Sequence, residues 1–159
     1  MIMRMAKKWT DPVPDVPTPA LLRAARGAYT IGIRRELQKA GCDDVPRNAS
    51  YILGGIGNRG QSASNLVRQL GISKQAASEL VETLVGRDYL KRGDVPDDRR
   101  RVDLTLTARG KAAAAAIRSG VETVDQVLRS LLTPEQHDGL RAGLIALCDI
   151  RDGWENEEI

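Results

Sequence analysis

The chain has 159 residues, enough for one domain with a single core. It carries 24 Lys and Arg against 21 Asp and Glu, so its net charge of +3 indicates no particular partner. Aromatic residues make up 3% and Phe is absent, which favours packed helices over a β-sandwich or barrel. Two cysteines without CxxC spacing and a single histidine, His137, argue against a four-ligand metal centre, and we expect neither a metal nor a cofactor.

Residues 1–17 are expected to form an extended arm, because Pro12, Pro14 and Pro17 disfavour a helix. The arm is either a disordered tail or a segment that contacts DNA or a partner subunit. No apolar run approaches the ~20 residues of a membrane span, and no signal-peptide pattern precedes the prolines. The sequence therefore predicts a cytoplasmic protein with reduced thiols.

A dimerisation helix is predicted within residues 18–45, followed by a short helix at about 46–56. Thr18 has the character of an N-cap, Pro19 would occupy the first helical position, and Gly41 would end the first helix.

Residues 55–60 read GIGNRG, a formal match to the dinucleotide fingerprint GxGxxG. A dinucleotide fold needs several βαβ units, and the flanking sequence does not read as a run of strands. We therefore interpret these glycines as a flexible turn between two helices, with nucleotide binding as the weaker alternative.

A helix-turn-helix is predicted between about Ser62 and Leu84. Ser62 and Ser73 have the character of N-caps, and Gly71 supplies the bend between the two helices. The second helix has an apolar side made of Ala77, Leu80, Val81 and Leu84. Its outward side carries small polar residues with one Lys and one Gln, which suit base edges and phosphates: Ser73, Lys74, Gln75, Ser78 and Glu82.

Two short strands are predicted after this helix, at 89–92 and 102–106, and GDVPDDRRR joins them. A hairpin in this position is the wing of a winged helix. Arg99, Arg100 and Arg101 crowd together at its tip, which favours an anionic partner, while Asp97 and Asp98 can orient the arginines. We therefore predict a DNA-binding lobe over residues 46–106.

Residues 107–152 are predicted to form two C-terminal dimerisation helices, followed by an acidic tail at 153–159. Thr107 caps the first of them, whose five consecutive alanines allow close approach of a neighbour. TPEQ at 133–136 is a capping box for the last helix. The terminal helices are more apolar than one small lobe needs, so they predict a two-fold homodimer on a palindromic DNA site.

From about Ser62 to Gly110 the chain resembles the MarR family of bacterial transcriptional regulators. The resemblance rests on Ser73–Leu84, on YLKR at 89–92 and on the run DDRRRVDLTLTARG. Within that run, Asp98 and Arg100 match the Asp-x-Arg motif of the family's wing, and Leu106, Thr107 and Gly110 match the residues that open the next helix.

The resemblance implies an obligate dimer that binds palindromic double-stranded operator DNA. It implies contacts of the recognition helix in the major groove and a wing arginine in or beside the minor groove. It also implies a pocket between the dimer helices and the DNA-binding lobe, where small aromatic acids or similar effectors bind and release DNA in many members.

Two residues depart from the family pattern. Glu79 stands where members often carry Arg, and a carboxylate there would repel phosphate, which bears on operator preference and affinity. Asp88 replaces the Gly that usually precedes the first wing strand, and Asp tolerates the left-handed conformation better than most residues.

The sequence therefore predicts a mainly α protein with a small β-hairpin wing, acting as a repressor that an effector releases from DNA. Alternatives are a winged helix used for protein contact and a regulator without an effector. We see no nucleophile–base pair that would support an enzyme. Cys42 is expected to be a packed or idle thiol, with redox sensing as the alternative. The predicted DNA contacts are Ser73, Lys74, Gln75, Ser78, Arg87, Lys91, Arg92, Asp98, Arg99, Arg100 and Arg101.

Overall fold

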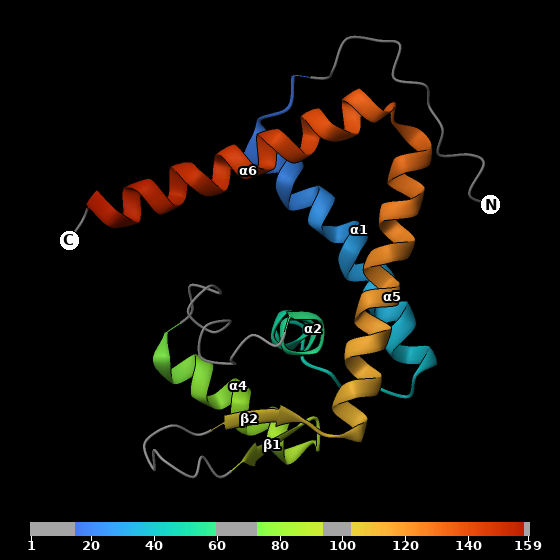
Figure 1. The fold of residues 1–159 in the computed structure, drawn as a ribbon, viewed down its shortest axis with the longest axis vertical. Coiled ribbons are helices and arrows are strands. Elements are labelled where there is room, and N and C mark those ends of the chain that lie inside the picture. Colours follow the sequence, from blue (N-terminus) through green and yellow to red (C-terminus); the bar gives the residue numbers. More distant parts are fainter. Residues whose placement is uncertain (1–14, 60–72, 94–102, 158–159) are drawn as a thin grey trace. The chain divides into compact units, whose positions relative to one another are not determined.

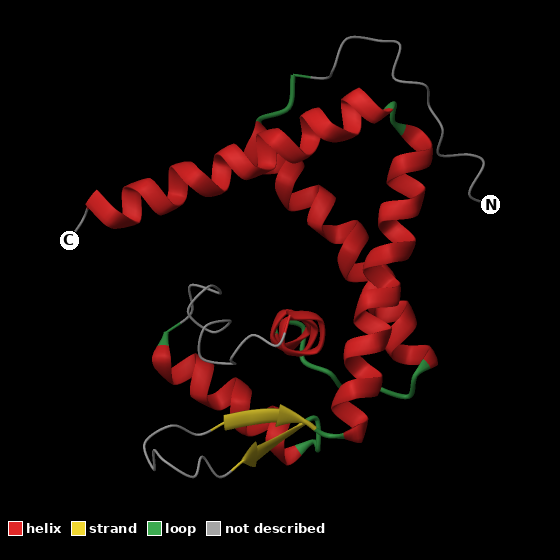
Figure 2. Cartoon of the chain, in the orientation of Figure 1, coloured by secondary structure: helices red, strands yellow, loops and turns green. Residues whose placement is uncertain are grey.

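The computed structural model describes residues 15–59, 73–93 and 103–157. The described chain is mainly helical with one small antiparallel hairpin, which confirms the predicted fold class (Figure 1, Figure 2). It divides into two compact units, one of residues 16–124 and a second that contains residues 125–157 of the described chain. None of the described helices combines the length and apolar character of a membrane span.

Helix α1 (Thr18–Lys39) begins one residue earlier than predicted. Pro17 is the N-cap, and the predicted capping role of Thr18 is wrong because no side chain caps this end. The Pro17 carbonyl already accepts bonds from the N–H groups of Ala20 at 2.9 Å and Leu21 at 3.2 Å. Thr18 therefore lies inside the first helical turn.

Gly41 ends α1 as predicted, in a Schellman motif. Its φ of +66° lies in the left-handed region, which glycine adopts without strain. The Gly41 N–H donates to the Gln38 carbonyl at 3.1 Å, and the Cys42 N–H donates to the Leu37 carbonyl at 2.8 Å. This turn carries Cys42 into the core, where it is 2% exposed, so the expectation of a packed thiol is confirmed.

Helix α2 (Ala49–Arg59) shows that the interpretation of GIGNRG as a turn is wrong. The helix continues through residues 55–59, and this also opposes a dinucleotide fingerprint, whose glycines must form a loop. Packing explains the helix: Gly54 is buried, and a Cβ there would lie 3.3 Å from Ile117 Cγ2 of α5 (Ala108–Leu131). Gly54 immediately precedes the motif, and its close packing against α5 stabilises the helix that continues into the motif.

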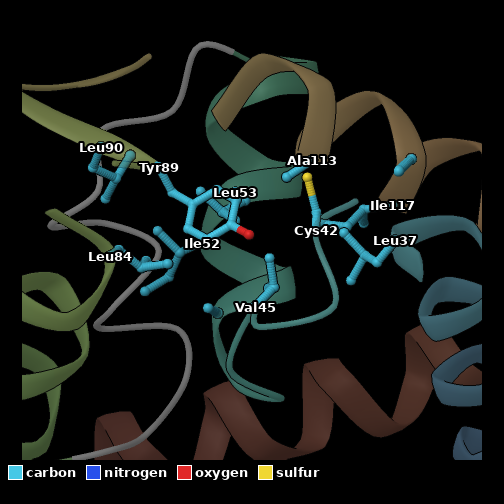
Figure 3. Close-up of a cluster of buried hydrophobic side chains, with 12 residues drawn as sticks. Leu37, Cys42, Val45, Ile52, Leu53, Leu84, Tyr89, Leu90, Ala113 and Ile117 are labelled. Atoms are coloured by element: carbon cyan, nitrogen blue, oxygen red, sulfur yellow. The ribbon is translucent and has the colours of Figure 1, made fainter. Parts of the chain in front are cut away.

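The core of residues 16–124 lies where α1, α2, α5 and α4 (Lys74–Gly86) contribute apolar side chains to one cluster (Figure 3). Tyr89 is the largest fully buried side chain, and Figure 3 shows it among Ile52, Leu53 and Leu84. Leu90, 1% exposed, begins strand β1 (Leu90–Gly93), which pairs with the antiparallel strand β2 (Asp103–Leu106). The hairpin is therefore anchored in the core at its base.

Helices α1 and α5 approach each other closely at Gly32 and Gly120. A Cβ on Gly120 would lie 2.6 Å from Ile33 Cα and 2.8 Å from Ile33 N, and one on Gly32 would lie 3.0 Å from the Gly120 carbonyl oxygen. A Cβ at either glycine would collide with backbone atoms, which cannot move aside as a side chain does. Glycine is thus required for the crossing.

Helix α6 (Pro134–Glu157) begins with the predicted capping box. The Thr133 N–H donates to Gln136 Oε1 at 2.9 Å, and the Gln136 N–H donates to Thr133 Oγ1 at 3.3 Å. The helix continues to Glu157, so the predicted start of the acidic tail at 153 is too early. Its large apolar side chains are exposed in the single chain: Leu140, Leu144, Ile145, Leu147, Ile150 and Trp154.

Candidate nucleic-acid interface

Helix α4 separates an apolar side from a polar side as the sequence predicts. Ser73 is its N-cap, and its Oγ accepts a hydrogen bond from the Ala76 N–H at 3.2 Å. Ala77 and Leu84 are buried, while Leu80 and Val81 are half-buried. The exposed side consists of the predicted polar residues together with Glu79: Ser73, Lys74, Gln75, Ser78 and Glu82.

Glu79 contacts one of the predicted base-reading residues. The Gln75 Nε2 group donates to Glu79 Oε1 at 3.0 Å, one helical turn along the exposed side. Glu82, one turn further, forms an ion pair with Arg92 of β1. The described polar side of α4 thus carries one cation, Lys74, and two acids, of which one is paired.

The end of α4 is a second Schellman motif. The Tyr89 N–H donates to the Leu84 carbonyl at 2.8 Å, and the Asp88 N–H donates to the Val85 carbonyl at 3.0 Å. Asp88 has a φ of 59°, the left-handed conformation expected at this position. The replacement of glycine by Asp88 therefore preserves the turn from α4 into the hairpin.

A polar cluster of four residues joins this turn to the segment between α1 and α2; we call Asp44, Arg87, Tyr89 and Arg109 the Asp44 cluster. The Tyr89 hydroxyl donates to Asp44 Oδ1, which also accepts a bond of 2.8 Å from Arg109 Nη2. Arg87 donates to the Asp44 carbonyl, and Arg109 donates to the Arg87 carbonyl at 2.6 Å. The Arg109 guanidinium also lies over the Tyr89 ring, 4.4 Å from its centroid.

These contacts shift both acidic groups of the cluster. The hydrogen bond from Tyr89 lowers the pKa of Asp44 most; burial opposes this effect, and the charge of Arg109 lowers the pKa further. Burial, and then the hydrogen bond to Asp44, raise the pKa of Tyr89 well above its ordinary value. At neutral pH Asp44 is therefore a carboxylate and Tyr89 a neutral donor.

Thr107 and Gly110 fix the exit from the hairpin into α5. Thr107 Oγ1 donates to the carbonyls of Asp88 and Tyr89, and it accepts a bond from the Gly110 N–H at 2.9 Å, as predicted for a helix cap. A Cβ on Gly110 would lie 3.0 Å from the Tyr89 carbonyl carbon and closer still to its oxygen. Only glycine fits at this contact, which explains the glycine in the sequence motif.

The predicted DNA-contacting residues differ in whether they have partners within the chain. Arg87 and Arg92 are exposed but have partners within the chain, Asp44 and Glu82 respectively. Lys91 is exposed and forms no ion pair or hydrogen bond with another described residue. The predicted wing-tip contacts, Asp98, Arg99, Arg100 and Arg101, lie outside the described residues.

Residues 43–101 match the sequence model of the MarR family, which spans α2, α4 and β1. This stretch, 59 of the 159 residues, is therefore similar to the MarR family. No curated protein is significantly similar to the chain.

Solved structures share the MarR fold over most of the chain. The S. aureus MepR–DNA complex is 20% identical, covers 85% of this chain and 98% of its own, and has a TM-score of 0.69. RV1404 from Mycobacterium tuberculosis is 24% identical, with coverages of 87% and 94% and a TM-score of 0.62. Bordetella bronchiseptica BpsR, whose DNA binding is regulated by 6-hydroxynicotinic acid, is 21% identical, with coverages of 87% and 98% and a TM-score of 0.64. At these sequence identities, the similarity between this chain and the solved structures establishes a shared fold only.

A cavity of about 1220 Å³ lies beside the MarR-type winged helix, between α1, the 43–48 segment, α2 and α5. Its wall combines Tyr29 and Tyr51 with apolar residues such as Ile117. The charged residues of the wall are four arginines and one acid: Arg26, Arg34, Arg35, Arg47 and Asp43. This composition suits a small anion with an apolar body.

Sequence reasoning missed Asp44 and Arg109. Asp44 lies 45 residues from Tyr89 and 65 residues from Arg109, so no local pattern links them. Arg109 lies within the run that resembles the MarR family, yet its role as a partner of Asp44 has no signal in that run. The described residues contain no group of His, Cys, Asp and Glu that could hold a metal ion.

Proposed function

We propose that the protein is a homodimeric MarR-type transcriptional regulator, a repressor that binds palindromic operator DNA and is released by a small-molecule effector. Helix α4 carries this proposal: its apolar side is packed in the core, and Lys74, Gln75 and Ser78 are exposed beside a hairpin. Such a helix can enter the major groove with its polar side chains at base edges and phosphates. The family match and the DNA complex among the similar folds support it. The proposal implies a cytoplasmic location, where chromosomal DNA lies.

The proposed contacts divide between bases and backbone. Ser73, Lys74, Gln75 and Ser78 read bases or fix α4 to phosphates, whereas Arg87, Lys91 and Arg92 hold the backbone. Their intramolecular bonds leave further N–H donors on Arg87 and Arg92, because a guanidinium has five. Asp98, Arg99, Arg100 and Arg101 are proposed to grip the minor groove or the adjacent backbone, with Asp98 orienting the arginines.

Dimerisation is proposed through the terminal helices. The exposed apolar side chains of α6 form a surface that a soluble monomer rarely leaves uncovered, and α1 in the other unit separately exposes Leu21, Leu22 and Ile31. A two-fold dimer would place two recognition helices about 34 Å apart, one turn of duplex. Light scattering coupled to gel filtration should give the mass of a dimer, and a monomer at micromolar concentration would contradict this assignment.

Effector binding is proposed in the cavity beside α1 and α2. A small aromatic acid would place its carboxylate among the arginines and its ring against Tyr29 and Tyr51. Asp43 and Val45 line the cavity on either side of Asp44, which contacts Arg87 at the end of α4. An effector that displaces this segment would thereby favour a position of α4 unsuited to DNA. Benzoate-type acids should raise the melting temperature, and Arg34→Ala should weaken this effect.

Fluorescence anisotropy with labelled DNA from the region that flanks the gene tests DNA binding directly. If ~6–10 phosphates are neutralised per dimer, affinity should fall about 10³–10⁵-fold between 50 and 200 mM salt. Arg100→Ala should weaken binding strongly while the dimer persists; Arg118→Ala, which removes an exposed cation from α5, is the control and should bind normally. Unchanged affinity of the Arg100 variant would remove the wing from the interface.

A protein-binding role is the second candidate, because α4 presents two acids against a single lysine. A winged helix used in this way would show no salt-dependent binding to the DNA that flanks its gene. If instead DNA is bound but no acid changes the affinity, the protein is a regulator without an effector.

A further inference from the structure

Glu79 differs from the other acid on the exposed side of α4. Glu82 is neutralised by an ion pair with Arg92. Glu79 has no cation partner in the part of the chain that the structure describes, and its Oε1 accepts a hydrogen bond from Gln75 Nε2 at 3.0 Å. An uncompensated carboxylate thus lies on the surface that the proposed function turns toward DNA.

Gln75 and Glu79 form a unit rich in hydrogen-bond acceptors. A carboxylate only accepts, so Gln75 must turn its NH₂ group toward Glu79. This leaves the amide oxygen of Gln75 and the second carboxylate oxygen of Glu79 as acceptors for an incoming group. Ser78 shares this exposed side and adds a hydroxyl that can donate or accept.

We propose that Glu79 is a specificity-determining residue that selects cytosine at one position of each operator half-site, with Gln75 holding its carboxylate in place. The inference rests on the proposed DNA-binding function. In the major groove, the amino groups of cytosine and adenine are the hydrogen-bond donors, whereas guanine and thymine present acceptors that repel a carboxylate.

Cytosine suits the carboxylate better than adenine because of the neighbouring atoms. The adenine amino group lies between two acceptors, N7 of the same base and O4 of the paired thymine. The cytosine amino group has an acceptor on one side only, O6 of the paired guanine. A carboxylate that approaches cytosine therefore meets less repulsion.

The same carboxylate weakens binding to DNA of every sequence, because it repels phosphates. Glu79 should therefore have two effects of opposite sign: it lowers affinity for random DNA and raises discrimination at one base pair. A residue that only maintains the structure of α4 would not change affinity and discrimination in opposite directions. This difference makes the inference testable.

The experiment selects binding sites from a randomised duplex library with the wild-type dimer, Glu79→Gln and Glu82→Gln. Glu82→Gln is the matched control, since it changes the charge of α4 equally. Each protein is then titrated on duplexes that carry cytosine or deoxyuridine at the selected position; deoxyuridine replaces the amino group by O4 and adds no methyl group. Circular dichroism checks that both variants are folded, as expected for exposed positions.

Wild type and Glu82→Gln should prefer cytosine about tenfold, the scale of one good base contact. Glu79→Gln should lose most of this preference and bind random DNA more tightly. The inference is wrong, while the proposed function stands, if the wild type binds DNA but selects no cytosine. The same holds if Glu79→Gln retains the preference for cytosine, or if both variants lose it. If wild type binds no DNA, both are wrong.

Discussion

Replacing Asp44 by Ala should lower the free energy of unfolding, although no local pattern in the sequence marks Asp44 as important. The change removes the acceptor of the Tyr89 hydroxyl and the carboxylate partner of Arg109 at once. Tyr89 is fully buried, and its hydroxyl would lose its hydrogen-bond acceptor. The bond of Arg87 is to the Asp44 backbone and remains available.

The size of the effect follows from the two contacts. An unsatisfied buried hydroxyl costs about 1–3 kcal/mol. The Asp44 side chain is 39% exposed and that of Arg109 36%, so their ion pair is screened by solvent and adds at most about 1 kcal/mol. Asp44→Ala should therefore lower the free energy of unfolding by about 2–3 kcal/mol. Tyr89→Phe leaves no orphaned group, because Asp44 keeps Arg109, and should lower it by about 1 kcal/mol.

The effect should depend on pH with a definite sign. Because the pKa of Asp44 is lower in the folded than in the unfolded state, the contribution of Asp44 to stability is complete above about pH 5. The contribution is lost as the pH falls through the folded pKa, which lies below the ordinary Asp value of 3.8. Tyr89 behaves in the opposite way: its pKa is raised, so its contribution is complete below the unfolded value of about 10 and falls above it.

Urea unfolding followed by circular dichroism at pH 7 and pH 3 measures these differences, with the protomer concentration held constant because the proposed dimer makes stability depend on it. Asp43→Ala is the matched control: it removes a neighbouring exposed acid and should change stability by less than about 0.5 kcal/mol. Equal midpoints for wild type and Asp44→Ala at pH 7, or an equal loss at both pH values, would refute the role assigned to the Asp44 cluster.

Two further predictions concern packing. Gly120→Ala should destabilise the fold by about 3 kcal/mol or more, because its Cβ would meet the backbone of Ile33. Gly27→Ala, whose Cβ would have nothing within 4 Å, should instead stabilise α1 by about 0.5–1 kcal/mol. Similar melting temperatures of the two variants would contradict the close crossing of α1 and α5. A thiol reagent such as DTNB should leave Cys42 unmodified in the folded protein and label both Cys42 and Cys148 in urea, and rapid labelling of Cys42 in the native protein would contradict its burial.

Local chemical rules predicted much of the winged helix. The N-cap Ser73, the cap Thr107, the left-handed Asp88 and the capping box at 133–136 each depend on a few neighbouring residues, and each is confirmed. The polar side of α4 was also predictable, because helical periodicity places Ala77 and Leu84 on the opposite side.

Features that depend on distant residues were not predictable in this way. The glycines of GIGNRG were interpreted as a turn on their local preference, but α2 continues through residues 55–59, and Gly54, which immediately precedes the motif, packs against Ile117 of α5. The crossing of α1 and α5 at Gly120 was missed for the same reason. The Asp44 cluster joins three segments of the chain, and a single sequence does not reveal such pairs.

The charges on α4 bear on how affinity and specificity are divided in the proposed complex. Lys74 and Lys91 form no hydrogen bond or ion pair with another residue that the structure describes, which gives two such cations per protomer and four per dimer. Arg99, Arg100 and Arg101 contribute three more per protomer in the sequence. If these ten cations of the dimer set the salt dependence, and not Arg87 and Arg92, which already have partners, the slope of log K against log salt should be about −9, and replacing the three wing arginines by Ala should reduce it to about −4. An unchanged slope would mean that affinity comes from elsewhere. A halved slope with unchanged base preference would mean that the wing supplies affinity while α4, with its uncompensated Glu79, supplies discrimination.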